Sequence, residues 1–581
     1  MKPPPKPTLD FRNTNSLWGS VLVETLVRLG VRHAVISPGS RSTPLTMALA
    51  RHAGIDCTPV LDERSAAFFA LGLARRAHQP VVLLCTSGTA GANYFPAVIE
   101  AQESGVPLLV ITADRPPEMR ECRSGQTIDQ QKLFGSHVNF YHELAVPEAS
   151  VKSLSCLRQT VSHAVERTHW PVAGPVHLNA PFRDPLPPIE DGSTAGLKKK
   201  IGSDFFDHLA ATARVDRMGE VPNLPPTKRG LIVTGPAQPA DPGQFAMMVE
   251  MLAFKTGWPV LADSLSPLRS YAAPGQPFIT SYDVLARNEK LMRQLRPDFV
   301  LSVGGWPISK TLRSCLEQWD ARTWIISESA GNQDALHGRT TIVRTRVELL
   351  AASLPEQEIA IDYCTDWACA EATVRDSLNR ELGAIKWMFE GKASWLMASL
   401  LPAHTPIFVA NSMPVRDLEY FWPLNDRGHA IYCNRGANGI DGTLSTALGV
   451  AHASERPAVL LTGDLALLHD TNGFLSVPKL KGSLTIVLIN NYGGGIFEHL
   501  PVSRDNPQFE AFFATPQQAN FKKLGAAYGV AHTLARDWKH FSVLISKLPK
   551  RGVRVLEVRT DRKRDAAFRK KILTAAAKVV G

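Results

Sequence analysis

Two short segments near the C-terminal end contain residues whose types and spacing suit a metal ion and a diphosphate. The first is Gly463-Asp464-Leu465, and the second is Asn490-Asn491-Tyr492-Gly493-Gly494-Gly495, in which Asn491 follows Asp464 by 27 residues. Magnesium prefers hard oxygen ligands, and it usually keeps phosphate oxygens and water in its coordination shell. Glycines beside such ligands let the backbone approach an anion closely. The two segments therefore predict a clamp for a metal ion and a diphosphate.

The elements that would position this clamp are two parallel strands. Residues 457–462 and 484–489 are apolar runs, typical of buried parallel strands, and they end in Gly-Asp and Asn-Asn. A helix that begins after the first strand would direct free N–H groups at the same anion. The alternative is an Asp that caps a helix and an Asn-Gly turn. Gly-Asp alone favours that alternative, whereas the pair at this spacing favours a cofactor site.

The composition is that of a soluble globular protein of about two to four domains. The chain has 581 residues, 44% hydrophobic and 20% charged. Its apolar runs are too short for a membrane span, and the N-terminal Met-Lys-Pro-Pro-Pro-Lys-Pro lacks the apolar core of a secretory signal. The eight cysteines are scattered without a Cys-x-x-Cys motif. We therefore expect reduced thiols, a cytoplasmic location, no zinc site and no membrane insertion.

The net charge of +10 raises the alternative of nucleic-acid binding. The basic residues are mostly dispersed, and the clusters at 198–200 and 562–571 lack interleaved aromatic residues. Solvated faces explain these clusters better, and a positive field would also attract anionic small substrates. We expect no nucleic-acid partner.

Three α/β blocks alternate apolar strands with helical patterns, which predicts doubly wound parallel sheets. The expected domains are residues 1–187, 229–355 and 356–581, with a linker at 188–228 rich in Gly, Lys and Pro. The first and third blocks look like distant copies of one layout. The expected strands, besides the two above, are 33–37, 81–85, 108–112, 176–178, 231–234, 299–303, 324–327, 407–409 and 554–558.

Several strand ends and glycine turns carry polar residues that could bind a substrate. Ser37-Pro-Gly-Ser-Arg-Ser42 follows the first expected strand, where ligands bind in doubly wound sheets. Asp62-Glu63-Arg64 precedes a helix of small residues, which alone indicates a helix cap. Five cations follow strand ends or glycine turns and together suit a substrate with several carboxylates. They are Arg41, Arg115, Lys310, Arg416 and Arg435.

The spacing of Gly-Asp and Asn-Asn resembles the signature of thiamine-diphosphate enzymes, although Leu465 stands where many members have glycine. Over nearly its whole length the chain resembles the family of 2-succinyl-5-enolpyruvyl-6-hydroxy-3-cyclohexene-1-carboxylate synthases. The most specific motifs are Ser37–Ser42, Ala113–Glu118, Asn434–Gly442 and Gly463–Leu465. The resemblance implies pyrimidine-binding, central and diphosphate-binding domains. It also implies a homodimer or homotetramer with sites between subunits.

The family implies a transferase of menaquinone or phylloquinone biosynthesis. Such an enzyme decarboxylates 2-oxoglutarate with thiamine diphosphate and Mg²⁺ or Mn²⁺. It then adds the succinyl carbanion equivalent to isochorismate.

The resemblance also implies a role for each candidate residue. Metal ligands would be Asp464, Asn491 and the Gly493 carbonyl, and further cofactor contacts would be Glu63, Ile440, Gly463, Leu465 and Gly494. Glu63 would hydrogen-bond the aminopyrimidine and promote loss of the thiamine C2 proton, helped by a dry pocket. Arg416, Arg435 and Ser412 would bind the group derived from 2-oxoglutarate. Ser40, Arg41, Arg115, Gln126 and Lys310 would face isochorismate, beside an apolar wall of Ile496, Phe497 and Leu500.

Two alternatives stay open at this point. Another thiamine-dependent carboligase or decarboxylase of the acetolactate synthase type would act on pyruvate. The central block carries only the weak Gly304-Gly305 as a dinucleotide signal. A non-catalytic protein that kept the fold is the second alternative, which intact Glu63, Asp464 and Asn491 disfavour.

Overall fold

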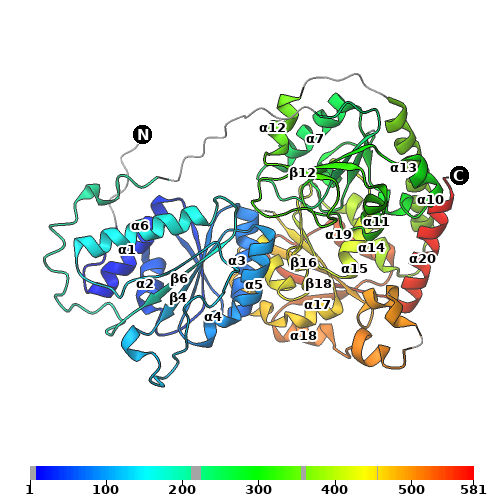
Figure 1. Ribbon diagram of the computed structural model, residues 1–581. Helices are drawn as coiled ribbons and strands as arrows, with labels where there is room; N and C mark the ends of the chain where they lie inside the picture. Colours follow the sequence, from blue (N-terminus) through cyan, green and yellow to red (C-terminus); the bar gives the residue numbers. More distant parts are fainter. Residues whose placement is uncertain are drawn as a thin grey trace. The chain divides into compact units, whose positions relative to one another are not determined.

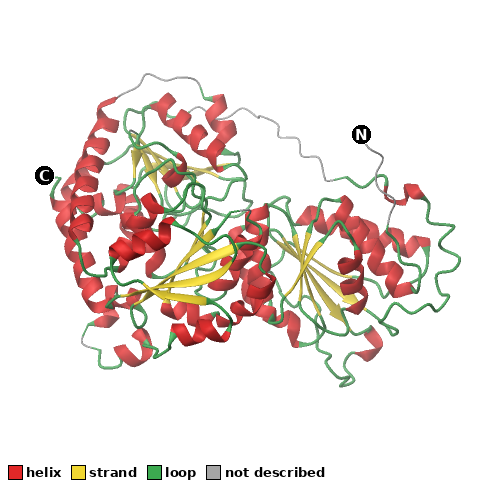
Figure 2. Cartoon of the chain, turned by 180° about the vertical axis from the view of Figure 1, so that it is seen from behind, coloured by secondary structure: helices red, strands yellow, loops and turns green. Residues whose placement is uncertain are grey.

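The computed structural model describes residues 8–210, 224–275, 277–354, 361–454, 456–504 and 506–580. The N-terminal segment 1–7 and part of the predicted linker lie outside these residues. Each of the three α/β blocks forms a sheet of six parallel strands, so the predicted fold class is confirmed. Figure 2 shows the strands of each sheet flanked by helices. No helix of the described ranges has the length and apolar character needed to cross a membrane.

The first sheet has the strand order β2-β1-β3-β4-β6-β5. Its strands are β1 (His33–Ile36), β2 (Asp56–Pro59), β3 (Val81–Cys85), β4 (Leu108–Asp114), β5 (Phe140–Glu143) and β6 (Pro175–Pro181). Its helices are α1 (Thr14–Arg28), α2 (Thr43–Arg51), α3 (Glu63–Ala77), α4 (Thr89–Asn93), α5 (Phe95–Ser104) and α6 (Val151–Arg167). In Figure 1, α1, α2 and α6 lie on one side of β4 and β6, and α3 and α5 lie on the other.

The second sheet has the order β12-β11-β10-β7-β8-β9. Its strands are β7 (Gly230–Thr234), β8 (Val260–Ala262), β9 (Phe278–Ile279), β10 (Phe299–Val303), β11 (Arg322–Ile326) and β12 (Thr340–Val343). The helices of this region are α7 (Pro242–Thr256), α8 (Leu268–Tyr271), α9 (Tyr282–Leu285), α10 (Glu289–Gln294), α11 (Lys310–Trp319), α12 (Val347–Ser353) and α13 (Ile361–Ala384). The predicted domain boundary near residue 356 stays a prediction, and α13 packs on α9 and β9.

The third sheet repeats the layout of the first, with the order β14-β13-β15-β16-β18-β17. Its strands are β13 (Ile407–Val409), β14 (Ile431–Tyr432), β15 (Ala458–Gly463), β16 (Ser483–Asn490), β17 (Ala531–Leu534) and β18 (Gly552–Arg559). The α-helices are α14 (Glu390–Leu400), α15 (Met413–Phe421), α16 (Thr443–His452), α17 (Asp464–His469), α18 (Phe521–Ala527), α19 (Trp538–Ser546) and α20 (Arg562–Lys578). Short 3-10 turns include η3 (Thr471–Lys479) and η4 (Gly495–His499). The matching strand orders confirm that the first and third blocks share one topology.

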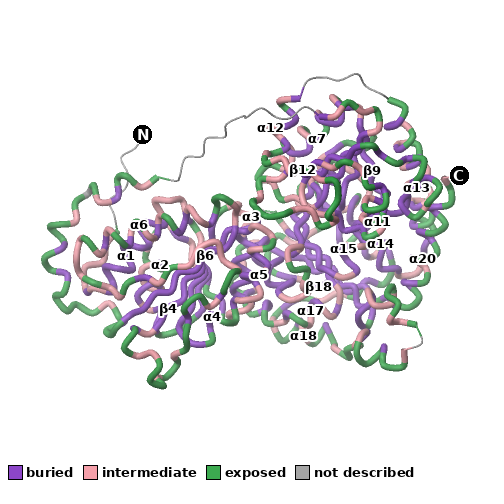
Figure 3. The backbone as a smooth tube through the Cα atoms, viewed as in Figure 1, coloured by how far each residue is buried: buried purple, intermediate pink, exposed green. Residues whose placement is uncertain are grey.

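The described chain divides into two compact units by its internal contacts. Unit 1 contains the first sheet with residues 434–453 and 470–481, and unit 2 contains the second and third sheets. Figure 3 shows that the buried segments of each unit follow its strands. Residues 434–453 join unit 1 because α16 packs closely on α3. A Cβ on Gly72 would lie 2.0 Å from the Thr446 carbonyl oxygen, and one on Gly449 would lie 2.0 Å from the Phe69 carbonyl oxygen.

Candidate active site

Asp464 and Asn491 lie at the carboxyl ends of two neighbouring strands in unit 2. β15 and β16 are parallel and pair from Ala458 with Leu484 to Gly463 with Ile489. The buried carboxylate of Asp464 accepts the N–H of Leu465 at 2.8 Å and the N–H of Gly493 at 2.9 Å. The hydrogen bond from Gly493 thus joins the two predicted segments of the clamp directly. Burial raises the pKa of Asp464 to about 6, and a cation beside this carboxylate would favour its ionised form.

The side chain of Asn491 offers an oxygen ligand beside this carboxylate. Its Nδ2 donates to Glu390 Oε2 at 2.9 Å, whereas its buried Oδ1 has no hydrogen-bond partner among the described residues. An orphaned buried carbonyl oxygen is costly unless a ligand satisfies it. An amide oxygen and a carboxylate are donors that a hard divalent cation prefers, so the residues present fit Mg²⁺.

The glycines around these two residues leave space where a diphosphate would need it. A Cβ on Gly463 would meet no described atom within 4 Å, so the backbone beside Asp464 faces open space. A Cβ on Gly495 would lie only 2.8 Å from Asn491 Nδ2. Gly493 has φ +132°, and its Cβ would lie 2.3 Å from the Ala514 carbonyl oxygen. Gly493 therefore requires glycine for its conformation and close approach, and a side chain on Gly495 would press on the Asn491 amide.

The predicted residues for the 2-oxoglutarate group that lie in unit 2 are Ser412 and Arg416. Ser412 directly precedes α15 and has φ +73°, a region that non-glycine residues rarely adopt and that is concentrated at functional sites. Arg416 Nη1 donates to the Ser412 carbonyl oxygen at 2.6 Å. The Arg416 side chain is therefore hydrogen-bonded to the backbone that leads into α15.

The remaining candidates in unit 2 lie on two different sheets. Ile496 and Phe497 belong to η4 directly after the glycine run, and Leu500 follows this turn with 37% of its surface exposed. Phe497 packs edge-on against Phe513. Lys310, in contrast, is exposed at the start of α11, which follows β10 of the second sheet.

Unit 1 brings Arg41, Arg115 and Gln126 together around Thr86 and Ser87, which follow β3. Arg115 Nη1 donates to Ser87 Oγ, and Gln126 Nε2 donates to the Ser87 carbonyl oxygen at 3.0 Å. Arg41 donates its backbone N–H to Thr86 Oγ1 at 3.2 Å. Burial, followed by the charge of nearby Arg115, lowers the pKa of Arg41. Two neighbouring guanidinium groups of this kind suit an anionic ligand.

Glu63 is the first residue of α3, and Asp62 caps this helix. Asp62 Oδ1 accepts the N–H of Ser65 at 2.8 Å, which confirms the helix cap that the sequence suggests at this motif. Glu63 is half-buried. Glu63 follows the carboxyl end of β2 (Asp56–Pro59) as the first residue of α3, so it lies at the carboxyl edge of the first sheet.

The loop that carries Arg435 and Ile440 belongs to unit 1, although its sequence lies in the third block. The buried carboxylate of Glu100, on α5, accepts the N–H of Gly436 at 3.0 Å and that of Ala437 at 2.7 Å. Arg435 thus shares a compact unit with Arg41 and Arg115, whereas Arg416 belongs to unit 2. Ser40 is exposed directly before Arg41.

The sequence does not single out two residues that support this site, Glu100 and Glu390. Glu100 and Glu390 lie within or at the start of helices far from the motifs they contact. No short motif marks either glutamate.

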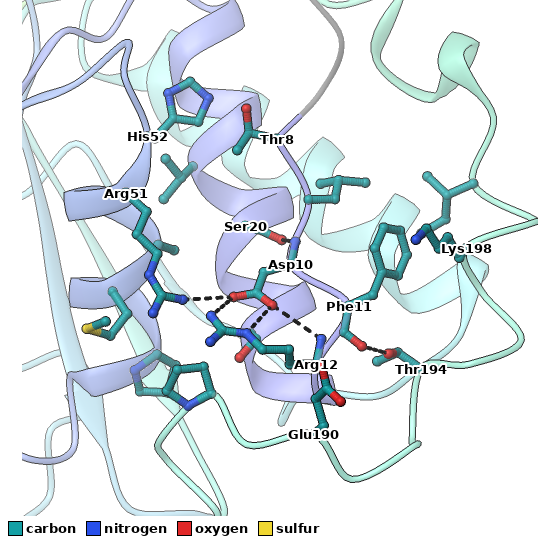
Figure 4. A pocket seen from close by; sticks show the side chains of 18 of the residues that line it. Thr8, Asp10, Phe11, Arg12, Ser20, Arg51, His52, Glu190, Thr194 and Lys198 are labelled. Carbon is teal, nitrogen blue, oxygen red and sulfur yellow. Dashed lines mark hydrogen bonds and ion pairs between the residues drawn. The ribbon is translucent and has the colours of Figure 1, made fainter.

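A cavity of about 810 Å³ in unit 1 contains none of these candidate residues. Figure 4 shows Asp10 between Arg12 and Arg51, with dashed lines to both. Arg12 Nε donates to Asp10 at 2.8 Å and Arg51 Nη1 donates to it at 3.2 Å. Asp10 therefore pairs with both arginines that line this cavity.

Comparisons with known proteins match the chain along nearly its whole length. The thiamine pyrophosphate enzyme N-terminal TPP binding domain matches residues 18–133. The middle domain of thiamine pyrophosphate enzymes matches residues 214–409, and the C-terminal TPP binding domain matches residues 415–558.

Curated relatives that match the chain carry the name 2-succinyl-5-enolpyruvyl-6-hydroxy-3-cyclohexene-1-carboxylate synthase. The relative from Rippkaea orientalis is 49% identical over 581 residues, covering 99% of this chain and 98% of its own. The relative from Gloeothece citriformis is 50% identical, covering 97% of this chain and 98% of its own. The one from Synechococcus sp. is 51% identical, with 97% and 96% covered.

Proposed function

Because the chain belongs to the family of 2-succinyl-5-enolpyruvyl-6-hydroxy-3-cyclohexene-1-carboxylate synthases, we propose that it catalyses the reaction of that name. This reaction is decarboxylation of 2-oxoglutarate and conjugate addition of the succinyl carbanion equivalent to isochorismate. The enzyme is a transferase of menaquinone or phylloquinone biosynthesis. The observation that carries the proposal is the pair formed by Asp464 and the orphaned Asn491 Oδ1, within a chain about 50% identical to its relatives.

The cofactor and metal site is assigned to the ends of β15 and β16. Asp464, Asn491 and the Gly493 carbonyl would hold Mg²⁺ or Mn²⁺, while Gly463, Leu465 and Gly494 would lie beside the diphosphate. Ile440 would support the bent cofactor, and Glu63 would form a hydrogen bond with its aminopyrimidine. Bound thiamine diphosphate supplies a nucleophilic carbon that allows a 2-oxoacid to lose carbon dioxide and transfer the remaining group.

The substrate residues divide by the carboxylates they would bind. Ser412, Arg416 and Arg435 would orient 2-oxoglutarate, since Arg binds carboxylates in a bidentate fork. Ser40, Arg41, Arg115, Gln126 and Lys310 would orient isochorismate, and Ile496, Phe497 and Leu500 would exclude water beside it. The clustering of Arg41, Arg115 and Gln126 around Thr86 and Ser87 supports the second group.

The assembly and location are also part of the proposal. A homodimer or homotetramer with sites between subunits would act in the cytoplasm, with no nucleic-acid partner and no membrane insertion. The exposed position of Gln126 and Ser40 in the single chain supports a site completed by another surface.

The test is incubation with 2-oxoglutarate, isochorismate, thiamine diphosphate and Mg²⁺, followed by the mass of the product. We expect one product whose mass equals the two substrates minus carbon dioxide. In parallel reactions, pyruvate replaces 2-oxoglutarate and each component is omitted in turn. Turnover of pyruvate alone would favour an acetolactate synthase type of activity, and absence of any turnover with bound cofactor would favour a non-catalytic protein.

A further inference from the structure

The orientation of the Asn491 amide is set by a second buried side chain, Glu390. An amide can present either its oxygen or its nitrogen in one direction, and only the oxygen binds a cation. Glu390 Oε2 lies 2.9 Å from Asn491 Nδ2, and an ionised carboxylate only accepts hydrogen bonds. The pair therefore holds Nδ2 toward Glu390 and leaves Oδ1 on the opposite side, where it has no partner among the described residues.

Glu390 is itself held in place by residues from α20. Its Oε1 accepts Arg569 Nη2 at 2.5 Å, and its backbone N–H donates to Asp565 Oδ2 at 2.9 Å. Arg569 is fixed in turn by two hydrogen bonds to Asp417, at 2.7 and 2.9 Å. Every one of these side chains is at least nine-tenths buried. In a dry surrounding such charge-assisted bonds are strong and directional.

The supporting helix is anchored on several other elements of unit 2. α20 packs on α13, α9 and η4. Asn288 Nδ2 donates to the carbonyl oxygens of Ala577 and Val580 near the end of the chain. Figure 1 shows α20 running beside α13 and α10. Arg569 therefore approaches Glu390 from a rigid, well-packed helix.

We propose that Glu390 is a positioning residue that turns the Asn491 oxygen toward the metal, with Arg569 and Asp565 holding Glu390 in place. This inference rests on the proposed function, because it assumes that Asn491 is a metal ligand. It assigns the start of α14 and the middle of α20 to the support of the metal site. Residues that orient metal ligands commonly contribute about 10- to 100-fold to metal affinity.

The test exchanges donor and acceptor between the two side chains. In Glu390→Gln, the oxygen of the introduced amide can keep the hydrogen bond from Arg569. The N–H₂ group of the same amide then faces Asn491 Nδ2, so that two donors oppose each other. The Asn491 amide then turns, and we expect Mn²⁺ affinity to fall about 10- to 100-fold. In the double variant with Asn491→Asp, the introduced glutamine donates to one aspartate oxygen while the other faces the metal. The Mn²⁺ affinity should return to within about threefold of the parent, because an oxygen again faces the metal.

The measurement is a titration of Mn²⁺ by electron paramagnetic resonance on the full-length protein with thiamine diphosphate present. The matched control is Glu557→Gln, because Glu557 is equally buried and accepts Asn490 Nδ2 at 2.9 Å, one residue before Asn491. This control disturbs an equivalent buried pair, and it should leave Mn²⁺ affinity unchanged. An equal loss of affinity in Glu557→Gln would indicate general structural damage and overturn the inference.

Three further outcomes complete the test. Parental Mn²⁺ affinity in Glu390→Gln, or no recovery in the double variant, overturns the positioning role. If Glu390→Gln does not fold, the Mn²⁺ affinity of Asn491→Asp is compared with that of the double variant. The positioning role predicts that only the double variant approaches the parental affinity. Asp464→Ala tests the metal site itself. If this variant kept the parental Mn²⁺ affinity, the metal site assigned in the proposed function would be wrong.

Discussion

The carboxylate of Glu100 accepts the backbone N–H of Ala437 at 2.7 Å, although 337 residues separate the two in sequence. The same carboxylate accepts the N–H of Gly436 at 3.0 Å, and Glu100 is 2% exposed. A helix of the first sheet thus fixes the loop that carries Arg435 and Ile440. Because these bonds are charge-assisted and buried, the conformation of the loop depends on them.

Replacing Glu100 with glutamine should loosen this loop, because one carboxylate oxygen becomes a donor that faces a backbone N–H. We expect the KM for 2-oxoglutarate to rise about tenfold, equivalent to the loss of one hydrogen bond to a charged group. Steady-state kinetics would measure the change. Glu103→Gln is the control, since Glu103 lies on the same helix and is exposed. An unchanged KM in Glu100→Gln would show that the loop holds its conformation without this carboxylate.

Every interior strand except β8 is predicted from sequence, whereas no edge strand is. β3, β10 and β13 have the predicted bounds, since each is buried throughout and, apart from Ser302 in β10, apolar. β9 and β14 have only two residues each, too few to show any pattern. The docking of α16 on α3 depends on Gly72 and Gly449, whose role appears only when both helices are placed.

The residues of the candidate site also differ in whether the sequence could predict them. Asp464 and Asn491 could be predicted because each lies at the end of an apolar strand, and strand ends meet at one edge of a parallel sheet. Glu390 could not be predicted, because it lies 101 residues before Asn491 at the start of a helix. Arg435 lies at the start of a glycine-rich motif of the third block. It nevertheless belongs to unit 1, because α16 packs on α3 and the next two residues donate their N–H groups to Glu100.

Glu63→Gln should keep the cofactor bound but slow the exchange of its C2 proton. The amide preserves the shape of the side chain while it removes the acid that would hydrogen-bond the aminopyrimidine. A positioned proton-transfer partner contributes about 10²- to 10⁴-fold, so we expect a slowing in that range. Deuterium exchange with acid quench measures the rate. Exchange at the parental rate would assign this role to another residue.

Arg416 and Arg41 should affect different halves of the reaction. Arg416→Ala should slow carbon dioxide release from 2-oxoglutarate in the absence of isochorismate. Arg41→Ala should leave this release largely intact and weaken isochorismate binding. Each lost charge-assisted bond is worth about 1.5–3 kcal/mol, or roughly ten- to a hundredfold in affinity. If Arg41→Ala slowed the first release as much as Arg416→Ala, the division of substrates between these residues would be wrong.

His177 should make the stability of the protein depend on pH. It is buried in β6 with Nε2 2.8 Å from Thr112 Oγ1, and burial lowers its pKa to about 3. In the unfolded chain this histidine has its ordinary pKa of about 6.5, so it binds a proton at pH values at which the folded protein leaves the ring neutral. The contribution of the neutral ring to the free energy of unfolding is therefore complete above about pH 6.5. It is lost as the pH falls toward 3. Between pH 6.5 and 5 the loss is about 2 kcal/mol.

Urea unfolding at pH 6.5 and pH 5 would measure this dependence, with His177→Gln as the comparison. The parent should lose about 2 kcal/mol more of its free energy of unfolding than the variant over this interval. Equal losses would mean that His177 does not contribute to the pH dependence.

The most direct test is a calorimetric titration of thiamine diphosphate and Mg²⁺ into the parent protein and into Asp464→Ala. The parent should bind the cofactor in a manner that depends on the metal, because the metal bridges the protein and the diphosphate. Asp464→Ala removes the charged ligand at the end of β15, and it should lose this metal-dependent binding while it keeps its fold. Equal affinity of the two proteins for thiamine diphosphate would contradict the assignment of the clamp to Asp464 and Asn491.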